Sequence, residues 1–421
     1  MSIAVVLAVV GGTFQDSPPA ARAGPDSTGS WGASMTPPAA SGRSASILFG
    51  TLGSMSSRAA QENAAGVRGA TVELNWGAYE PTQGQFSSSY VAEITAQVRA
   101  FRDAGQQLTL ALGIHYTPQW VRSLPDAVAV DQYGARRPGV DMVFSQPVRD
   151  AVSAYLARID RDLGVENFAY IRLTSGGNAE MLYNTTGSYA AFSAAAQNGS
   201  NLARGMAPNP SPGWKPGQRN VSSAQVRRWG DWYVSALGNV TRWQMGEFGR
   251  LGFQGVYQAI TPGSGVRPYQ YDKAVQEFLP DGLVGIGGVW QAYYAGLAGA
   301  GRIMVYVSSV ADGSAGDNTC YPSDLQARVI GTTPYTWSAT RWQSRLAAEY
   351  GFSVGGENPG YGDGRAVEPF YSDTTRDGMI TIALRQAVRC GFGVFNFAHD
   401  MQLWDGPYSL SAYAGAIRAL G

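Results

Sequence analysis

Two short apolar runs, ATVELNW at 70–76 and QLTLALGI at 107–114, flank the longer stretch SYVAEITAQVRAFRDA at 89–104. The flanking runs have the length and composition of buried strands, whereas the stretch between them has the apolar spacing of an amphipathic helix. It ends just before Gly105, a residue that commonly follows a helix C-terminus. The order strand, helix, strand predicts a βαβ unit and a parallel sheet.

The same alternation continues along the chain from Ala45, with further helical segments at 146–163 and 373–389. Eight parallel strands with intervening helices close a barrel that has no exposed edge. The sequence therefore predicts an α/β fold, a (β/α)8 TIM barrel with long βα-loops, and an open, doubly wound sheet is the alternative. The predicted strands cover residues 46–52, 70–76, 107–114, 168–175, 255–261, 302–310, 351–357 and 393–398.

The charge balance and the N-terminal sequence limit the partners and the location. Lys plus Arg number 31 and Asp plus Glu number 31, so the formal net charge is zero. This balance argues against a nucleic-acid partner and gives no reason to expect a membrane partner. Residues 1–23 hold an apolar run and a small-residue Ala-Arg-Ala site, and 24–44 are rich in Pro, Ser and Gly. We expect a signal peptide, then a flexible linker, and a secreted catalytic domain at 45–421.

The chain has two cysteines, Cys320 and Cys390. An exported protein can form a disulfide. The predicted strands place Cys320 in a loop at one end of the barrel and Cys390 just before a strand that enters from the other end. This placement argues against a bridge, unless the loop that carries Cys320 runs down the outside of the barrel.

Two glutamates follow predicted strands at the end where such barrels carry their active sites. Glu180 ends the motif SGGNAE after the fourth strand, and Glu357 lies in the motif GGENPG after the seventh. Each follows a Gly pair, which allows the backbone to approach a ligand closely. Glycoside hydrolysis needs two carboxyl groups that flank the bond. We therefore predict that Glu180 and Glu357 form a catalytic pair.

Polar and aromatic residues at the same strand ends are predicted to bind the substrate. Both histidines of the chain are among them. We expect the two tryptophans of this set to form a platform for a sugar ring, and an Asn and a His to bind its hydroxyl groups. The predicted substrate-binding residues are Trp76, His115, Asn178, Asn358, His399 and Trp404.

Other charged residues have structural interpretations. Glu73 and Arg172 lie inside predicted strands, so we expect them to point into the barrel and to pair with each other. Glu80 precedes Pro81, and we expect it to fix the loop. The chain has no GxSxG motif, and two distant histidines fall short of a zinc ligand set. We expect neither a metal nor a cofactor.

Two segments resemble a known group of enzymes. VELNWGAYEPTQGQF at 72–86 resembles the second-strand signature of clan A glycoside hydrolases, nearest to the family 42 and 35 β-galactosidases and the family 5 enzymes, and TPQWV at 117–121 is also similar to those families. The resemblance implies a TIM barrel and a retaining mechanism. It also implies an acid/base Glu after the fourth strand and a nucleophile after the seventh, the places of Glu180 and Glu357.

The acid/base segment departs from the clan A pattern, in which Asn directly precedes the Glu, because Ala179 separates Asn178 from Glu180. The run GGNAEMLYN at 176–184 also resembles the acid loop of β-amylases, which invert the anomeric centre. We therefore expect a glycosidase that cleaves a β-linked bond of an oligo- or polysaccharide with retention. An inverting, β-amylase-like enzyme and a non-catalytic carbohydrate-binding barrel are the alternatives. The loops at 183–225 and 311–335 would determine the sugar.

Overall fold

The computed structural model describes residues 47–310, 319–329, 336–358, 371–406 and 408–420. The predicted signal peptide at 1–23 and linker at 24–44 therefore lie outside the described residues, as does much of the loop at 311–335.

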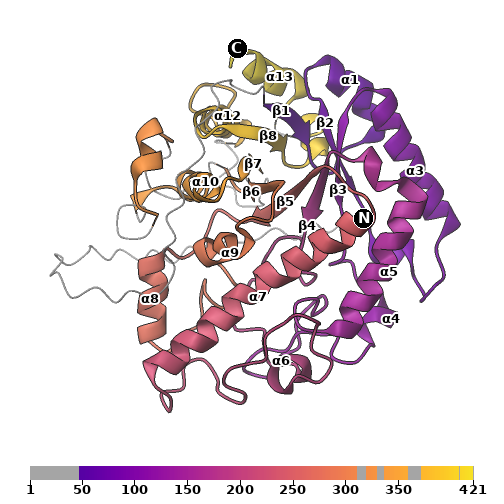
Figure 1. Ribbon diagram of the computed structural model, residues 1–421. Helices are drawn as coiled ribbons and strands as arrows, with labels where there is room; N and C mark the ends of the chain where they lie inside the picture. The colour runs from indigo at the N-terminus through magenta and orange to yellow at the C-terminus, as the bar shows by residue number, and fades with distance from the viewer. Residues whose placement is uncertain (1–46, 311–318, 330–335, 359–370, 407, 421) are drawn as a thin grey trace.

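Eight parallel strands pair in chain order, and β8 closes the ring on β1 (Figure 1). This is the predicted (β/α)8 barrel, and the alternative prediction of an open, doubly wound sheet is wrong. Every predicted strand is present, although most are shorter than predicted. The strands are β1 Leu48–Thr51, β2 Gly69–Glu73, β3 Gln107–Ala111, β4 Tyr170–Leu173, β5 Val256–Thr261, β6 Ile303–Val307, β7 Ser353–Glu357 and β8 Phe392–Phe397.

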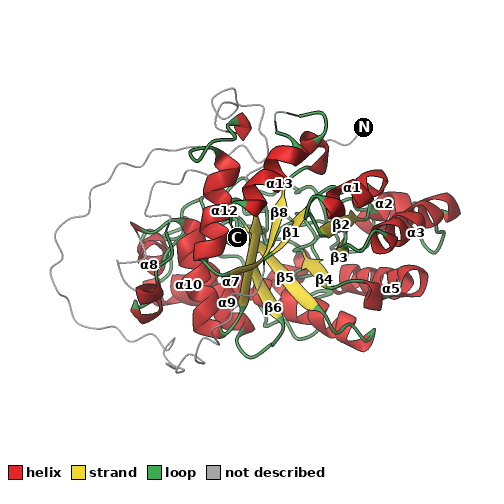
Figure 2. Ribbon diagram, turned by 90° about the horizontal axis from the view of Figure 1, so that it is seen from above, coloured by secondary structure: helices red, strands yellow, loops and turns green. Residues whose placement is uncertain are grey.

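Helices surround the strands on the outside of the barrel (Figure 2). The predicted helices at 89–104 and 146–163 correspond to α3 and α5, whereas the one predicted at 373–389 begins only at Met379, after Gly378 as N-cap. The helices are α1 Ala59–Ala64, α2 Trp76–Tyr79, α3 Ser88–Asp103, α4 Gln119–Arg122, α5 Gln146–Leu163, α6 Ala194–Asn198, α7 Ser223–Arg250, α8 Pro268–Gln276, α9 Trp290–Leu297, α10 Ala339–Tyr350, α12 Met379–Arg389 and α13 Leu410–Arg418.

The core has two parts because successive strand residues face opposite sides of the sheet. Ile171 and Leu173 of β4 belong to the large cluster between the strands and the helices. Tyr170 packs instead against a small cluster that includes Met304 and Val394 from other strands, inside the barrel. Arg172 alternates with Ile171 and Leu173, so it shares the inner side with Tyr170. A charged residue is thereby placed within the barrel.

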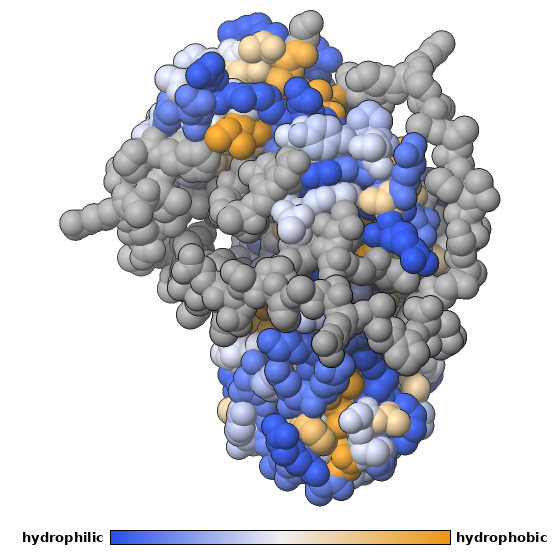
Figure 3. Space-filling model, turned by 90° about the vertical axis from the view of Figure 1, so that its left-hand side faces the viewer, coloured by the Kyte–Doolittle hydropathy of each residue, from blue (hydrophilic) through white to orange (hydrophobic). Residues whose placement is uncertain are grey.

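Hydrophilic residues predominate on the described surface in Figure 3, where hydrophobic residues form only small patches. Among the described residues, no helix is both long enough and apolar enough to cross a membrane.

The expectation against a Cys320–Cys390 bridge is wrong. The two residues form a disulfide with their Cα atoms 5.0 Å apart. The described segment 319–329 between β6 and α10 lies along α10, because Arg341 pairs with Asp324 and Arg345 donates to the carbonyl of Ala327. This segment thus lies on the outside of the barrel, where Cys320 reaches Cys390, the residue that ends α12.

Candidate active site

An ion pair inside the barrel joins two strands at their carboxyl ends. Nη2 of Arg172 on β4 lies 2.7 Å from Oε2 of Glu357, the last residue of β7, and both side chains are only 13% exposed. The predicted pairing of Arg172 with Glu73 is wrong, because the guanidinium donates to Glu357. Glu357 reaches Arg172 because it ends its strand on the inner side. The predicted nucleophile is therefore held by a buried cation.

A turn after β4 presents Glu180. The backbone N–H of Glu180 donates to Oδ1 of Asn178 at 3.1 Å, and the N–H of Met181 donates to the carbonyl of Ile260 in β5 at 2.9 Å. Thr174 also donates its hydroxyl to the carbonyl of Asn178. The side-chain oxygen of Asn178 thus orients the turn that carries Glu180, while its binding of a sugar hydroxyl stays a prediction.

The Glu180 carboxyl group is nearly enclosed, with the residue 9% exposed. Ser308, which follows β6, donates its hydroxyl to Oε1. Oε2 is buried and has no hydrogen-bond partner in the described part of the chain. Burial raises the pKa of Glu180 to about 7, the Ser308 hydroxyl opposes this rise, and the charge of Glu357 adds to it. Glu180 thus keeps its proton to a higher pH than an ordinary glutamate does, and the two glutamates interact electrostatically.

The Glu357 carboxyl group has a different environment from that of Glu180. Burial raises its pKa, while the charge of Arg172 and a hydrogen bond from Tyr306 lower it. Tyr306 lies on β6, and its ring stands 4.9 Å from the Arg172 guanidinium carbon. Two groups therefore stabilise the ionised form of Glu357, and both contact it directly.

His115 lies at the mouth of the barrel, after β3. Gly113 has a φ of +59°, and a Cβ there would lie 1.7 Å from the carbonyl oxygen of Leu74. This close approach requires glycine, and it brings the chain to a point where Nε2 of His115 is 3.9 Å from Oε1 of Glu73. Burial, with a contribution from the charge of Arg172, lowers the pKa of His115 to about 4. The imidazole is therefore neutral at neutral pH.

Trp76 does not form the expected sugar platform. The residue is 0% exposed, and its ring stacks on Tyr155 with the centroids 4.8 Å apart. Its indole N–H donates to Oε2 of Glu80 at 3.0 Å, while Oε1 of Glu80 accepts from the N–H of Gly84 at 2.8 Å. Glu80 fixes this loop, as predicted. Trp76 belongs to the supporting core because helix α5, which carries Tyr155, covers it.

Asn358 is also too buried to contact a substrate in this structure. It is 0% exposed, and its Oδ1 accepts a hydrogen bond from the N–H of Ala398 at 3.0 Å. This bond joins the end of β7 to the end of β8. The predicted binding role of Asn358 is therefore corrected to a structural one.

His399 and Trp404 lie together after β8, on the side of the mouth next to β1. His399 has a φ of +65°, rare for a residue with a side chain, and burial lowers its pKa. The indole N–H of Trp404 donates to Oδ1 of Asp400 at 3.1 Å. The guanidinium of Arg58 covers the Trp404 ring at 4.3 Å. One face of this half-buried ring is thus already occupied by a cation.

Ser308 and Tyr306, which contact the two glutamates, are not among the site residues predicted from the sequence. The sequence could have indicated both residues, because they fall in the predicted strand at 302–310. Tyr306 alternates with buried Val305 and Val307, as a residue that faces the barrel interior does.

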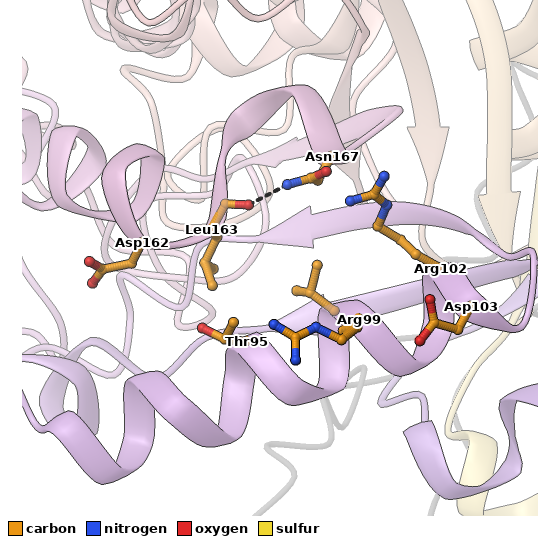
Figure 4. Close-up of a pocket in the computed structure, with 8 residues that line it drawn as sticks. Thr95, Arg99, Arg102, Asp103, Asp162, Leu163 and Asn167 are labelled. Carbon is orange, nitrogen blue, oxygen red and sulfur yellow. Dashed lines mark hydrogen bonds between the residues drawn. The ribbon is translucent and has the colours of Figure 1, made fainter.

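A separate cavity lies on the outside of the barrel, between α3 and α5 (Figure 4). Arg99 and Arg102 point toward it from α3, and Asp162 lies across from them. It adjoins the ends of these helices, which is the opposite end of the barrel from the glutamates. Among the described residues, no group of three His, Cys, Asp or Glu side chains is arranged to hold a metal ion.

No family model and no curated protein matches the sequence. Solved structures do match the fold. The catalytic domain of a β-amylase from Paenibacillus polymyxa is similar with a TM-score of 0.58 at 14% identity, over 89% of this chain and 99% of that one. A β-galactosidase from the haloarchaeon Halorubrum lacusprofundi gives 0.51 at 14% identity, over 88% of this chain and 57% of that one. The chain thus shares its barrel fold with glycosidases, as the resemblance in the sequence implied.

Proposed function

We propose that this protein is a glycoside hydrolase that cleaves a β-linked bond by a retaining mechanism. One observation carries the proposal: two buried glutamates at the carboxyl ends of β4 and β7 interact, yet only one of them has a cation bound to it. Environments that give two carboxyl groups different pKa values distinguish an acid from a nucleophile. The likeness of the barrel to glycosidase structures supports this interpretation.

Glu180 would act first as the general acid. Its pKa of about 7 leaves it largely protonated at mildly acidic pH, and its unpartnered Oε2 can carry the proton to the leaving oxygen. Glu357, whose ionised form Arg172 and Tyr306 stabilise against burial, would attack the anomeric carbon. Glu180 would then remove a proton from the water that hydrolyses the glycosyl-enzyme. A proton returns to Glu180 in this second step, so the cycle closes.

An inverting, β-amylase-like reaction is the second candidate. The likeness to the β-amylase domain, which this chain covers almost completely, favours it. In that reaction Glu357 would act as a general base on a water molecule, and about 6.5–9.5 Å would separate the carboxyl groups, against about 5–5.5 Å for retention.

We also propose that the protein is secreted. The Cys320–Cys390 disulfide supports export, because such bonds persist in oxidising compartments.

The test is a screen of nitrophenyl glycosides and polysaccharides with the wild type, Glu180→Ala and Glu357→Ala. Glu93→Gln, an exposed change on α3, is the matched control. We expect both active-site changes to lower kcat/KM by at least about 10²-fold, the usual contribution of acid–base catalysis. NMR of the first-formed anomer separates retention from inversion. Sugar binding without turnover by the wild type would contradict the enzymatic proposal and support a carbohydrate-binding barrel.

A further inference from the structure

One carboxyl group at the mouth of the barrel has no role in the proposed reaction. Glu73 ends β2, and its side chain is 42% exposed, whereas those of Arg172 and Glu357 are 13% exposed. Its charge acts on both of these residues. Glu73 therefore lies close to the catalytic groups, and it is more accessible than they are.

The partners of Glu73 leave part of its hydrogen-bonding capacity unused. An ionised carboxylate offers about four acceptor positions. Tyr116 donates one hydrogen bond, and His115 lies 3.9 Å away, beyond hydrogen-bond distance. Arg172, the nearby cation, donates instead to Glu357. The exposed part of the carboxylate can thus accept hydrogen bonds from a molecule in the mouth.

The surroundings of Glu73 favour a neutral donor. Burial raises the pKa of Glu73, while the charge of Arg172 and the hydrogen bond from Tyr116 oppose this rise and stabilise the carboxylate. His115 stays neutral because burial lowers its pKa. Two adjacent hydroxyl groups of a sugar ring are neutral donors that can bind one carboxylate through both oxygens. Hydrogen bonds to a charged acceptor are stronger than those between neutral groups. Such a contact distinguishes sugars by the configuration of their hydroxyl groups.

We propose that Glu73 is a specificity-determining residue, whose carboxylate accepts hydrogen bonds from adjacent ring hydroxyls of the sugar that reacts at Glu357. This inference rests on the proposed glycosidase function. Tyr116, which is 39% exposed and 4.0 Å from the His115 ring, would border the same sugar. The carboxylate then selects the sugar, while Glu180 and Glu357 carry out the bond cleavage.

The experiment measures kcat/KM of the wild type, Glu73→Gln, Glu73→Ala and the control Glu93→Gln. The substrates are the 4-nitrophenyl glycoside that the wild type cleaves best and its monodeoxy analogues. We expect Glu73→Ala to lower kcat/KM on the full sugar by roughly 10- to 100-fold, the effect of one charged hydrogen bond. On an analogue that lacks one of the two contacted hydroxyls, the loss should be at least about threefold smaller than on the full sugar, because one hydrogen bond is already absent. Glu73→Gln should give an intermediate loss, because a neutral amide oxygen is a weaker acceptor.

Equal losses on the full and the deoxy sugars would overturn the inference, because a residue that only positions its neighbours affects every substrate alike. Activity of Glu73→Ala within twofold of wild type on all sugars would also overturn it. Thermal unfolding of both Glu73 variants shows whether they fold. If neither variant folds, the wild type alone gives the test. A kcat/KM that differs by less than threefold between the full sugar and every deoxy analogue would then refute the role of Glu73 in selecting the sugar. A wild type without turnover on any glycoside would instead refute the proposed function.

Discussion

The described part of the chain contains two buried pairs of acidic residues, and only the first pair has the catalytic role proposed above. Glu180 and Glu357 lie at the ends of β4 and β7, and Glu62 and Asp400 lie beside β1 and β8. In all four residues burial is the largest cause of a raised pKa. The pairs differ in their partners rather than in their depth.

In the second pair, no cation bonds either carboxyl group within the described part of the chain. Glu62 and Asp400 are both 0% exposed and hydrogen-bond to each other. Asp400 also accepts from the N–H of Met55 at 2.7 Å and from Trp404. Two acids in this arrangement share a proton, because burial and mutual repulsion disfavour a second charge. The shared proton joins the segment after β8 to the segment after β1.

In the first pair, Arg172 makes the two members unequal. It bonds directly to Glu357 and acts on Glu180 only through its charge. One carboxyl group can therefore be ionised while the other holds a proton. A buried cation that bonds only one carboxyl group of a pair thus gives the two groups different protonation, as an acid and a nucleophile require.

Removing that cation should have the largest effect. Arg172→Met would leave Glu357 without its main stabilising charge, so its pKa would rise and the nucleophile would be protonated. We expect kcat/KM near pH 6 to fall by about 10²- to 10⁴-fold and the ascending limb of the pH profile to move to higher pH. Breaking a buried ion pair should also lower the free energy of unfolding by about 3–5 kcal/mol.

Arg172→Lys is the matched variant, because it keeps the charge and loses the planar guanidinium. It should retain more activity than Arg172→Met and keep the ascending limb near its wild-type position. A methionine variant with a wild-type pH profile would contradict the role assigned to Arg172.

Neutralising the second pair should affect stability and its pH dependence. Because the folded state raises the pKa of Glu62, folding favours its protonated form. This stability is present below the ordinary glutamate pKa of about 4.3 and is lost as pH rises toward the folded pKa. Glu62→Gln keeps the shape without the titration. We expect its Tm to decline less than that of the wild type between pH 4.5 and 8, measured by calorimetry, with kcat unchanged.

The exposed change Glu93→Gln is the control, and its Tm should follow the wild type across the same range. If the Tm of Glu62→Gln declined as steeply as that of the wild type, the inference that Glu62 and Asp400 share a proton would be wrong.

The strand order and the closeness of Glu180 to Glu357 could be predicted from the sequence because both depend on local patterns. Strand period and helix spacing placed all eight strands, and Gly pairs marked the turns before Glu180 and Glu357. Side-chain partners could not be predicted in the same way. Arg172 has three carboxylates within electrostatic range, and only the three-dimensional stagger of the strands decides that it bonds to Glu357.

Exposure was the other quantity that the sequence did not reveal. Trp76 and Asn358 lie at strand ends as predicted, but neighbouring elements cover them completely. The disulfide was missed because the path of the loop after β6 along α10 depends on contacts such as Arg341 with Asp324. Each of these features depends on packing between segments that are distant in the sequence.

The smallest expected effect comes from removing the Ser308 hydroxyl group, which donates to Glu180. Ser308 donates to Oε1 and lowers the pKa of Glu180, opposing burial. Ser308→Ala should therefore raise this pKa above about 7. A general acid must be protonated to act, so the descending limb of kcat/KM against pH should move to higher pH by about one pH unit.

Ser309→Ala is the neighbouring control, because that hydroxyl accepts from the N–H of Gly263 instead. Its profile should match the wild type. A shift of the descending limb to lower pH in Ser308→Ala would show that the hydroxyl does not stabilise the ionised form, and the assignment of Glu180 as the acid would then lose its electrostatic basis.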